Sequence, residues 1–104
     1  MSPGLSGLAC AIAFAADRNV VGTVYYRDKE PAADAAVQLE DINTLSVVSR
    51  MTDHAGRYRF TGLSPDRSYQ IRAIKKGFST KLRVLSQFSS KPVEKVDLYL
   101  RPEP

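Results

Sequence analysis

From residue 19 onward, apolar and β-branched side chains alternate with polar ones in short runs, and glycine, proline, aspartate and serine separate the runs. Alternation with a period of two is typical of half-buried β-strands, and no segment shows the sustained 3.6-residue period of a helix. We expect strands over residues 20–26, 36–41, 46–52, 57–61, 69–75, 81–85 and 94–100. Seven short strands in a chain of 104 residues indicate an all-β fold, a Greek-key β-sandwich of two sheets.

The inward-facing side chains follow from parity, because successive side chains on a strand point to opposite faces of the sheet. The residues predicted to face inward are Val20, Gly22, Val24, Val37, Leu39, Tyr58, Phe60, Tyr69, Ile71, Ala73, Val96, Leu98 and Leu100. Their neighbours Arg57, Arg59 and Lys95 are expected to face water. Burial of each large apolar side chain contributes roughly 1.5–3 kcal/mol, so this core offsets most of the ordering entropy of a small domain.

The stretch TDHAGRYRF, residues 52–60, has two interpretations. In one it is an active-site loop, with His54 as a general base and Asp53 as its partner. In the other it is a tight turn, in which the Asp53 carboxylate accepts hydrogen bonds from backbone amides two or three residues on and Gly56 supplies a positive φ. We favour the turn and expect a hairpin, with the aromatic residues that follow directed into the core.

A second turn is expected at GLSPDRSY, residues 62–69. Gly62 is predicted to turn the chain off the sheet, Leu63 to close the end of the sandwich and Pro65 to fix the bend. Tyr69 then re-enters the sheet, where its hydroxyl can hydrogen-bond back to the upstream loop as in a tyrosine corner.

The two turns belong to a longer ordered series: Gly22-x-Val24, Val37-x-Leu39, Thr52-Asp53-x-x-Gly56-x-Tyr58-x-Phe60, Gly62-Leu63-x-Pro65, Tyr69-x-Ile71-x-Ala73 and Lys76-Gly77-Phe78. This series resembles the carboxypeptidase regulatory-like domain over about residues 20–100. The resemblance implies a transthyretin-like or prealbumin-like sandwich of seven strands. It also implies an extracytoplasmic accessory module that is not itself a peptidase.

The first sixteen residues, MSPGLSGLACAIAFAA, contain no charged side chain. The apolar run is shorter than the about 20 residues that cross a bilayer. It has the length of a signal-peptide core, and Ala13-Phe14-Ala15 fits the small-x-small cleavage pattern. We therefore expect a signal peptide at residues 1–15, one domain at residues 16–104, and a secreted, periplasmic or cell-envelope location without a transmembrane span.

Candidates for catalytic chemistry are few. His54 is the only histidine and Cys10 the only cysteine, which leaves no internal disulfide and no metal site built from several cysteines or histidines. Hydroxyisourate hydrolases of a related fold carry several catalytic histidines and end in Tyr-Arg-Gly-Ser, whereas this chain ends in LYLRPEP. We expect no enzyme, no catalytic residue, no metal and no cofactor, and a small hydrolase that uses His54 is an alternative.

Two surfaces are candidates for binding. Tyr25 and Tyr99 have outward parity and are neighbours if the first and last strands pair, so they form either an aromatic platform for a glycan or a cross-strand packing pair. The second surface is the densest basic patch: Lys75, Lys76, Lys81 and Arg83. That patch suits an anionic lipid, a cell-wall polymer or an acidic protein face, or it is a solvated strand edge that discourages aggregation.

The charge balance limits the partners further. Fifteen Lys and Arg against 11 Asp and Glu give a net charge of +4, which favours anionic neighbours but falls short of a nucleic-acid-binding surface. The sequence predicts a non-catalytic module at the bacterial cell envelope that binds a protein partner or has a structural role, with carbohydrate binding as the alternative. A sheet edge that accepts a partner strand is the most direct route, since main-chain hydrogen bonds supply the affinity.

Overall fold

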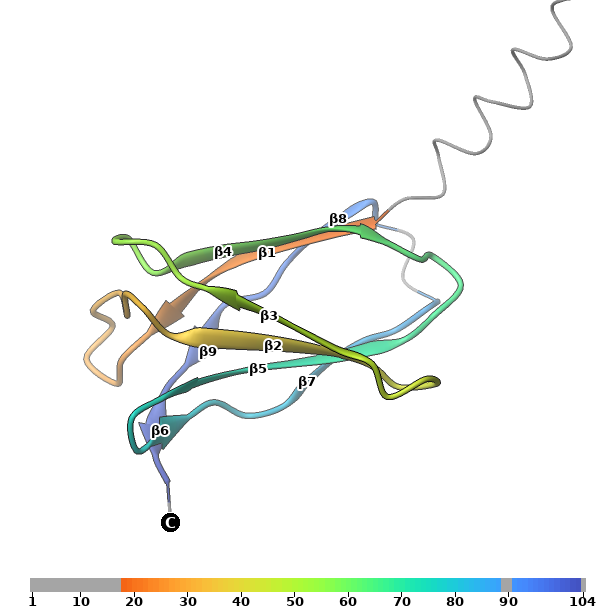
Figure 1. Ribbon diagram of the computed structural model, residues 1–104. Helices are drawn as coiled ribbons and strands as arrows, with labels where there is room; N and C mark the ends of the chain where they lie inside the picture. The colour runs from red at the N-terminus through yellow and green to blue at the C-terminus, as the bar shows by residue number, and fades with distance from the viewer. Residues whose placement is uncertain (1–17, 89–90, 104) are drawn as a thin grey trace, which may run out of the picture.

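The computed structural model describes residues 18–88 and 91–103, so the predicted signal peptide at residues 1–15 and Cys10 lie outside the described residues. Within the described part, the chain forms β-strands and contains no helix that is long and apolar enough to cross a membrane (Figure 1). The strands are β1 (Arg18–Tyr25), β2 (Ala36–Asp41), β3 (Val47–Met51), β4 (Arg57–Leu63), β5 (Tyr69–Lys75), β6 (Phe78–Ser79), β7 (Arg83–Leu85), β8 (Val93–Lys95), β9 (Leu98–Tyr99) and β10 (Arg101–Pro102).

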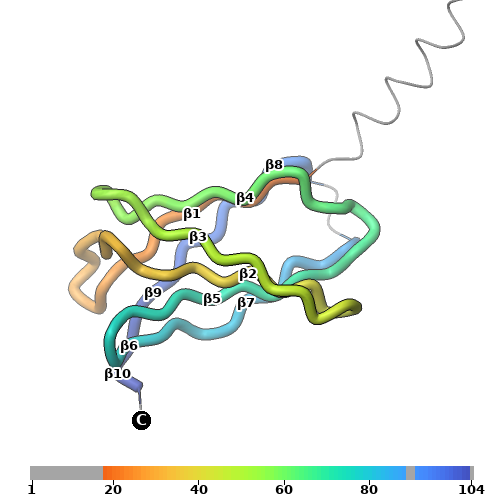
Figure 2. Tube along the Cα trace, in the orientation of Figure 1, coloured from red at the N-terminus to blue at the C-terminus, as the bar shows by residue number. Residues whose placement is uncertain are grey.

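The strands form two sheets that pack face to face as a sandwich (Figures 1 and 2). In the first sheet β1 lies between β4 and β8 and also pairs with β9. The second sheet has the order β10-β6-β5-β2-β3, and β7 pairs with β5. Strands β8 and β9 run parallel to β1, whereas the other pairings are antiparallel. The predicted all-β sandwich is confirmed.

Residues 18–88 and 91–103 form ten short strands rather than the predicted seven. The strand expected at residues 94–100 is divided between β8 and β9, which both pair with β1, and β10 follows it and pairs with β6 of the other sheet. The strand expected at residues 81–85 shortens to β7, and β6 precedes it. Side-chain alternation reports which face is buried and not how the backbone pairs, so it does not reveal the break between β8 and β9.

The core lies between the two sheets. Every residue predicted to face inward is buried, and Val24, Val37 and Ile71 have no exposed surface. The structure adds Ala32, Ala35 and Leu85 to this core. The arginine and lysine neighbours that were predicted to face water are exposed.

The turn at Asp53 is tight, but it does not close a hairpin. Asp53 Oδ1 accepts hydrogen bonds from the amides of Ala55 and Arg57, each at 2.9 Å, and Gly56 has a φ of 74°. The strand before the turn, β3, pairs with β2, whereas the strand after it, β4, pairs with β1. The turn therefore carries the chain from one sheet to the other. The hairpin prediction is wrong because the same local hydrogen bonds serve either connection, and tertiary pairing decides between them.

Gly62 lies inside β4 instead of ending it. Arg18 is opposite Leu63 and Val20 is opposite Phe60, so two steps along β1 match three along β4. This extra residue is a β-bulge, and Gly62 supports it with a φ of 69°. The prediction that Gly62 turns the chain off the sheet is wrong, since its positive φ serves the bulge.

The remainder of the second turn agrees with the sequence analysis. Leu63 is partly buried and packs against the core, and Pro65 lies in the turn that follows β4. Tyr69 is buried, and its hydroxyl oxygen accepts a hydrogen bond of 3.0 Å from the Ser64 amide. This bond is the predicted link from the tyrosine back to the upstream loop.

Candidate interaction surfaces

Tyr25 and Tyr99 are neighbours, as predicted. Strands β1 and β9 pair in parallel with these two residues in register, and their rings stack with centroids 5.3 Å apart and planes inclined by 18°. Tyr99 is half exposed and Tyr25 partly exposed. Each ring covers one face of the other. Their role in glycan binding stays a prediction.

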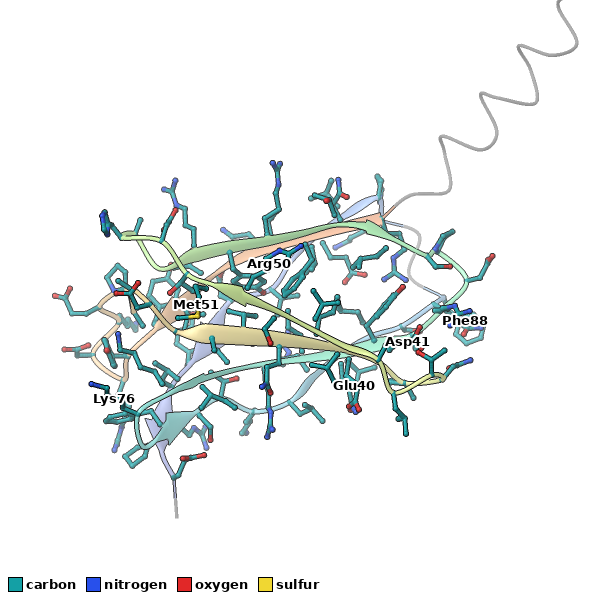
Figure 3. All side chains as sticks on the ribbon, viewed as in Figure 1. Glu40, Asp41, Arg50, Met51, Lys76 and Phe88 are labelled. Atoms are coloured by element: carbon teal, nitrogen blue, oxygen red, sulfur yellow. The ribbon has the colours of Figure 1, made fainter. Side chains whose placement is uncertain are left out.

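The basic residues of the predicted patch fall into two pairs. Lys75 lies at the end of β5, with its Nζ donating a hydrogen bond to the Ala33 carbonyl oxygen, and Lys76 follows in the turn at that end of the sandwich (Figure 3). Arg83 is paired with Ile71, four residues earlier on β5. At about 3.3 Å per residue, Arg83 lies roughly 13 Å from Lys75 along the strand direction.

Lys81 and Arg83 lie near Tyr99 instead. Together with Asp97 and Arg101 they line a small concave surface of about 110 Å³ between β7 and β9. Arg83 Nη1 lies 3.5 Å from the Asp97 carbonyl oxygen. The structure therefore joins half of the predicted basic patch to the tyrosine pair, which the sequence analysis treated as separate surfaces.

A second cationic surface, the outer face of the first sheet, was not predicted. Val21 lies opposite Arg59 of β4 on one side and opposite Lys95 of β8 on the other, and Thr23 lies opposite Arg57. Opposed residues point to the same face, and neighbouring strands are about 4.8 Å apart. The three cations therefore project from one face. With Tyr25, and with Asp53, Arg50 and Met51 near the edge of the other sheet, they line an open concave surface of about 810 Å³.

Arg57, Arg59 and Lys95 take part in no ion pair in the part of the chain that the structure describes. Within the described residues, the ion pairs join Arg18 to Glu94 and Arg67 to Asp41, each at 2.9 Å. The sequence analysis assigned Arg57, Arg59 and Lys95 to solvent one by one. Only the strand order β4-β1-β8 brings them into adjacent rows, and that order follows from tertiary pairing.

The β3 edge, defined as the side of β3 that faces away from β2, is the third candidate. Strand β3 pairs with β2, and all five of its residues are exposed. Three of them are apolar, with exposed fractions of 54% for Val47, 44% for Val48 and 60% for Met51. Apolar side chains on a strand edge are unusual for a surface that stays in water.

The direction of the backbone groups on β3 follows from the hydrogen bonds at its two ends. The Thr52 amide donates to the Ala35 carbonyl and the Asp41 amide to the Ser46 carbonyl, each at 2.9 Å. In an antiparallel ladder the residues that bond to the partner alternate. Even-numbered residues of β3 therefore bond to β2. The N–H and C=O groups of its odd-numbered residues, Val47, Ser49 and Met51, point to the open edge.

The turn that holds His54 directs its carboxylate to the backbone. His54 is exposed, and the carboxylate expected to orient it accepts backbone hydrogen bonds from Arg57 and Ala55. The hydrogen bond from the Arg57 amide, with help from the Ala55 amide, lowers the pKa of Asp53 below its ordinary value. Across residues 18–88 and 91–103, no group of three or more His, Cys, Asp or Glu side chains is placed to hold a metal ion.

Solved structures with a similar fold include enzymes and pilins. A 3-chlorocatechol 1,2-dioxygenase from Rhodococcus opacus matches 85% of this chain with 12% identity and a TM-score of 0.63. A streptococcal ancillary pilin matches 85% with 11% identity and a TM-score of 0.62, and the shaft pilin SpaA from Lactobacillus rhamnosus GG matches 85% with 9% identity and a TM-score of 0.60. The chain covers 61%, 33% and 47% of these three structures.

These likenesses at low identity show the fold alone, and comparison with curated proteins finds no match. A protein-family comparison is more specific, since the carboxypeptidase regulatory-like domain matches residues 19–101, nearly the whole described part. The family resemblance in the turn and strand motifs is thereby confirmed. This chain belongs to the carboxypeptidase regulatory-like domain family.

Proposed function

We propose that this protein is a non-catalytic, exported module that binds a protein partner by adding a strand of that partner to the β3 edge. The observation that carries the proposal is the exposure of all five β3 residues together with the outward direction of the backbone groups of Val47, Ser49 and Met51. An added strand supplies N–H and C=O partners to these groups, and it covers the apolar side chains beside them.

The other long edge, on β4, is a poorer acceptor. Gly62 forms a bulge in β4, and Arg57 and Arg59 place two charges along the strand. Bulges and charged side chains are devices that keep edge strands from pairing. Strand β3 has five consecutive pairs with β2 and no bulge, and its sequence, VVSRM, contains one charge and no proline.

The comparisons support an interaction module in general terms. The family is a regulatory-like domain, and two of the similar folds are named as pilins. Support for export is the charge-free apolar stretch at residues 1–15. Support for a non-catalytic role is the use of the Asp53 carboxylate by backbone amides beside the single histidine.

Capture of partners from a bacterial envelope extract tests this proposal when the bait is compared with two variants. In Ser49→Pro the lost N–H points away from β2, so the β2–β3 ladder is retained while the edge loses a donor. In Ser49→Ala the donor remains. We expect the same partner with the unchanged chain and with Ser49→Ala, and its loss with Ser49→Pro. A partner that binds all three equally would contradict the proposal, and so would the absence of any partner strand, whether from another protein or from a second copy of this chain.

Carbohydrate binding is a second candidate, and the outer face of the first sheet favours it. The row of Arg59, Val21 and Lys95 lies on the same face as the stacked pair of Tyr25 and Tyr99. Guanidinium groups bind carboxylates in a bidentate manner, and aromatic rings stack on sugar rings. The chemistry suits a glycan that carries acidic groups.

A glycan array separates the two functions. Binding of acidic glycans that disappears in Tyr25→Ala and Tyr99→Ala, and weakens in Arg59→Gln, would support this candidate. Ser49→Pro is the matched control, because it alters the other sheet. If no glycan is retained, or if the aromatic variants bind as the unchanged chain does, the carbohydrate function is wrong.

A further inference from the structure

We infer that the strand added to the β3 edge is β3 of a second copy of this chain, antiparallel and centred on Ser49. The inference rests on the proposed function, since it names the occupant of the same edge. A two-fold axis through Ser49 places the two Ser49 residues opposite each other and Val47 opposite Met51 of the second copy. Each sandwich then contributes its second sheet to one continuous sheet.

The backbone groups match in this register. Val47, Ser49 and Met51 are the residues whose N–H and C=O groups point to the open edge, and in this arrangement they meet only one another. A slip of one residue would place Ser49 opposite Val48 of the second copy, whose backbone groups are directed toward its own β2, and the hydrogen bonds would be lost. A slip of two residues restores the match but leaves the terminal groups without a partner strand.

The side chains match as well. Opposed residues of paired strands point to the same face, so Val47 and Met51 of the second copy lie side by side on the outer face of the joined sheet. These are two of the most exposed apolar side chains of the strand, at 54% and 60%. The pair occurs twice because of the symmetry, once on each side of the small Ser49.

Charge does not oppose this pairing. Arg50 is the one charged residue of β3, and the register places it opposite Val48 of the second copy rather than opposite the other Arg50. Its guanidinium carbon lies 5.9 Å from the centre of the Phe60 ring, between β3 and β4 (Figure 3). The guanidinium also donates a hydrogen bond of 3.3 Å to the Ser49 carbonyl, an exposed contact that a strand partner would replace.

The expected dimer is weak. Stable interfaces bury about 1,600 Å² in total, and two paired strands of five residues each bury less. We expect a dissociation constant on the order of micromolar. An affinity of this order makes association dependent on local concentration.

A charge-swap experiment tests both the dimer and its register. Sedimentation velocity over a concentration series is measured on the purified full chain and on two double variants. Val47→Lys with Met51→Lys places like charges opposite each other in both symmetric pairs, whereas Val47→Lys with Met51→Glu places opposite charges there. All the altered side chains are exposed, so the fold is retained.

The unchanged chain is expected to dimerise. The variant with two lysines should form a dimer that is at least about tenfold weaker, and the variant with lysine and glutamate should recover most of the dimer affinity of the unchanged chain. Equal association of the two variants would overturn the register. A chain that stays monomeric at every concentration would overturn the dimer. In that case a Ser49-dependent partner from the envelope extract would leave the proposed function standing, and the absence of both would reject both.

Discussion

At the scale of single residues, Asp53 and Tyr58 stabilise the chain through a carboxyl group and a phenol group, which titrate at opposite ends of the pH range. The Asp53 carboxylate accepts two amide hydrogen bonds, which lower its pKa. The buried Tyr58 hydroxyl donates a hydrogen bond of 2.6 Å to the Val96 carbonyl oxygen, and burial, with a smaller contribution from Asp97, raises its pKa. The free energy of unfolding should therefore depend on pH in acid through Asp53 and at alkaline pH through Tyr58.

Asp53 should contribute to loss of stability in acid. Its folded pKa is below the reference value of 3.8, so its contribution is present above that pH and is lost as the pH falls through the folded value. In Asp53→Asn the amide oxygen still accepts the backbone hydrogen bonds but does not titrate. Urea unfolding from neutral pH down to pH values below 3.8 should show a smaller acid-dependent loss for the variant than for the unchanged chain. Parallel profiles for the two proteins would contradict the role of this carboxylate.

Tyr58 should act at alkaline pH. The unfolded phenol ionises near its reference value of 10.0, before the folded one, so its contribution is complete below pH 10 and declines as the pH rises above it. The decline has a limiting slope of about 1.4 kcal/mol per pH unit. Tyr58→Phe should lower the free energy of unfolding by about 1–2 kcal/mol at neutral pH and reduce the alkaline decline. Tyr99→Phe, on the exposed face, is the control; if both variants keep the same alkaline decline, Tyr58 is not its source.

At the scale of elements, Gly22 explains why the last strand is divided. A Cβ atom built on Gly22 would lie 1.7 Å from the Val96 carbonyl oxygen, so the backbone of Val96 occupies the place of a side chain. Val96 and Asp97 separate β8 from β9 at this point. Its amide donates to the Val21 carbonyl, and Asp97 Oδ1 accepts a hydrogen bond from the Thr23 amide beyond it. The missing side chain thus allows the interruption in the parallel pairing.

Gly22→Ala should be strongly destabilising, because the nearest atoms are backbone and cannot move independently. We expect a loss of about 3 kcal/mol or more in the free energy of unfolding, measured by urea denaturation. Gly77→Asn is the matched control, because Gly77 has open space around it and a φ of 78° that asparagine tolerates. A loss for Gly22→Ala no larger than that of the control would show that the close approach to Val96 is not required.

The sequence predicted the elements better than their connections. Alternation located the buried face of the five strands for which inward residues were predicted, and the aspartate and glycine of residues 52–60 predicted a tight turn, because both signals are local. Three features were not predicted: the connection between the two sheets at Asp53, the bulge at Gly62, and the interruption of the last strand beside Gly22. Each depends on which strand becomes the neighbour, and a single sequence does not encode that choice locally.

Prediction of the candidate surfaces was limited in the same way, because the sequence does not show locally which strands become neighbours. Outward parity was enough to predict that Tyr25 and Tyr99 meet if their strands pair, and they do. The four basic residues around Gly77 were grouped by sequence distance, and the structure divides them, because Arg83 lies opposite Ile71, four residues before Lys75 on β5. Strand order also decided that β3 is an edge, which no pattern within its five residues reveals.

At the scale of the whole molecule, the sandwich is bridged on one side and open on the other. Strand β9 pairs with β1 of the first sheet and β10 with β6 of the second, so the end of the chain links the two sheets there. On the opposite side the sheets end at β4 and β3 (Figure 2). The open side therefore carries the edge that we propose for strand addition, while the bridged side carries the tyrosine pair.

The bridged side has a second link at the opposite end of β1. Arg18, at the start of β1, forms an ion pair of 2.9 Å with Glu94 of β8, and its side chain is 5% exposed. Its other guanidinium nitrogen donates to the Arg67 carbonyl oxygen at 3.2 Å, which lies in the turn before β5 of the other sheet. One buried cation thus connects the first sheet with the turn that leads into the second.

Removal of Arg18 should weaken the whole sandwich and not only one strand end. Arg18→Ala leaves the Glu94 carboxylate, 20% exposed, without its ion partner, and we expect a loss of about 2–3 kcal/mol in the free energy of unfolding. Glu94→Ala should cost less, because Arg18 keeps its bond to the Arg67 carbonyl. A double-mutant cycle by urea denaturation should then give a coupling energy of about 1 kcal/mol or more. Additive losses would mean that the two charges act independently, and that the start of β1 is held to β8 by its backbone pairing alone.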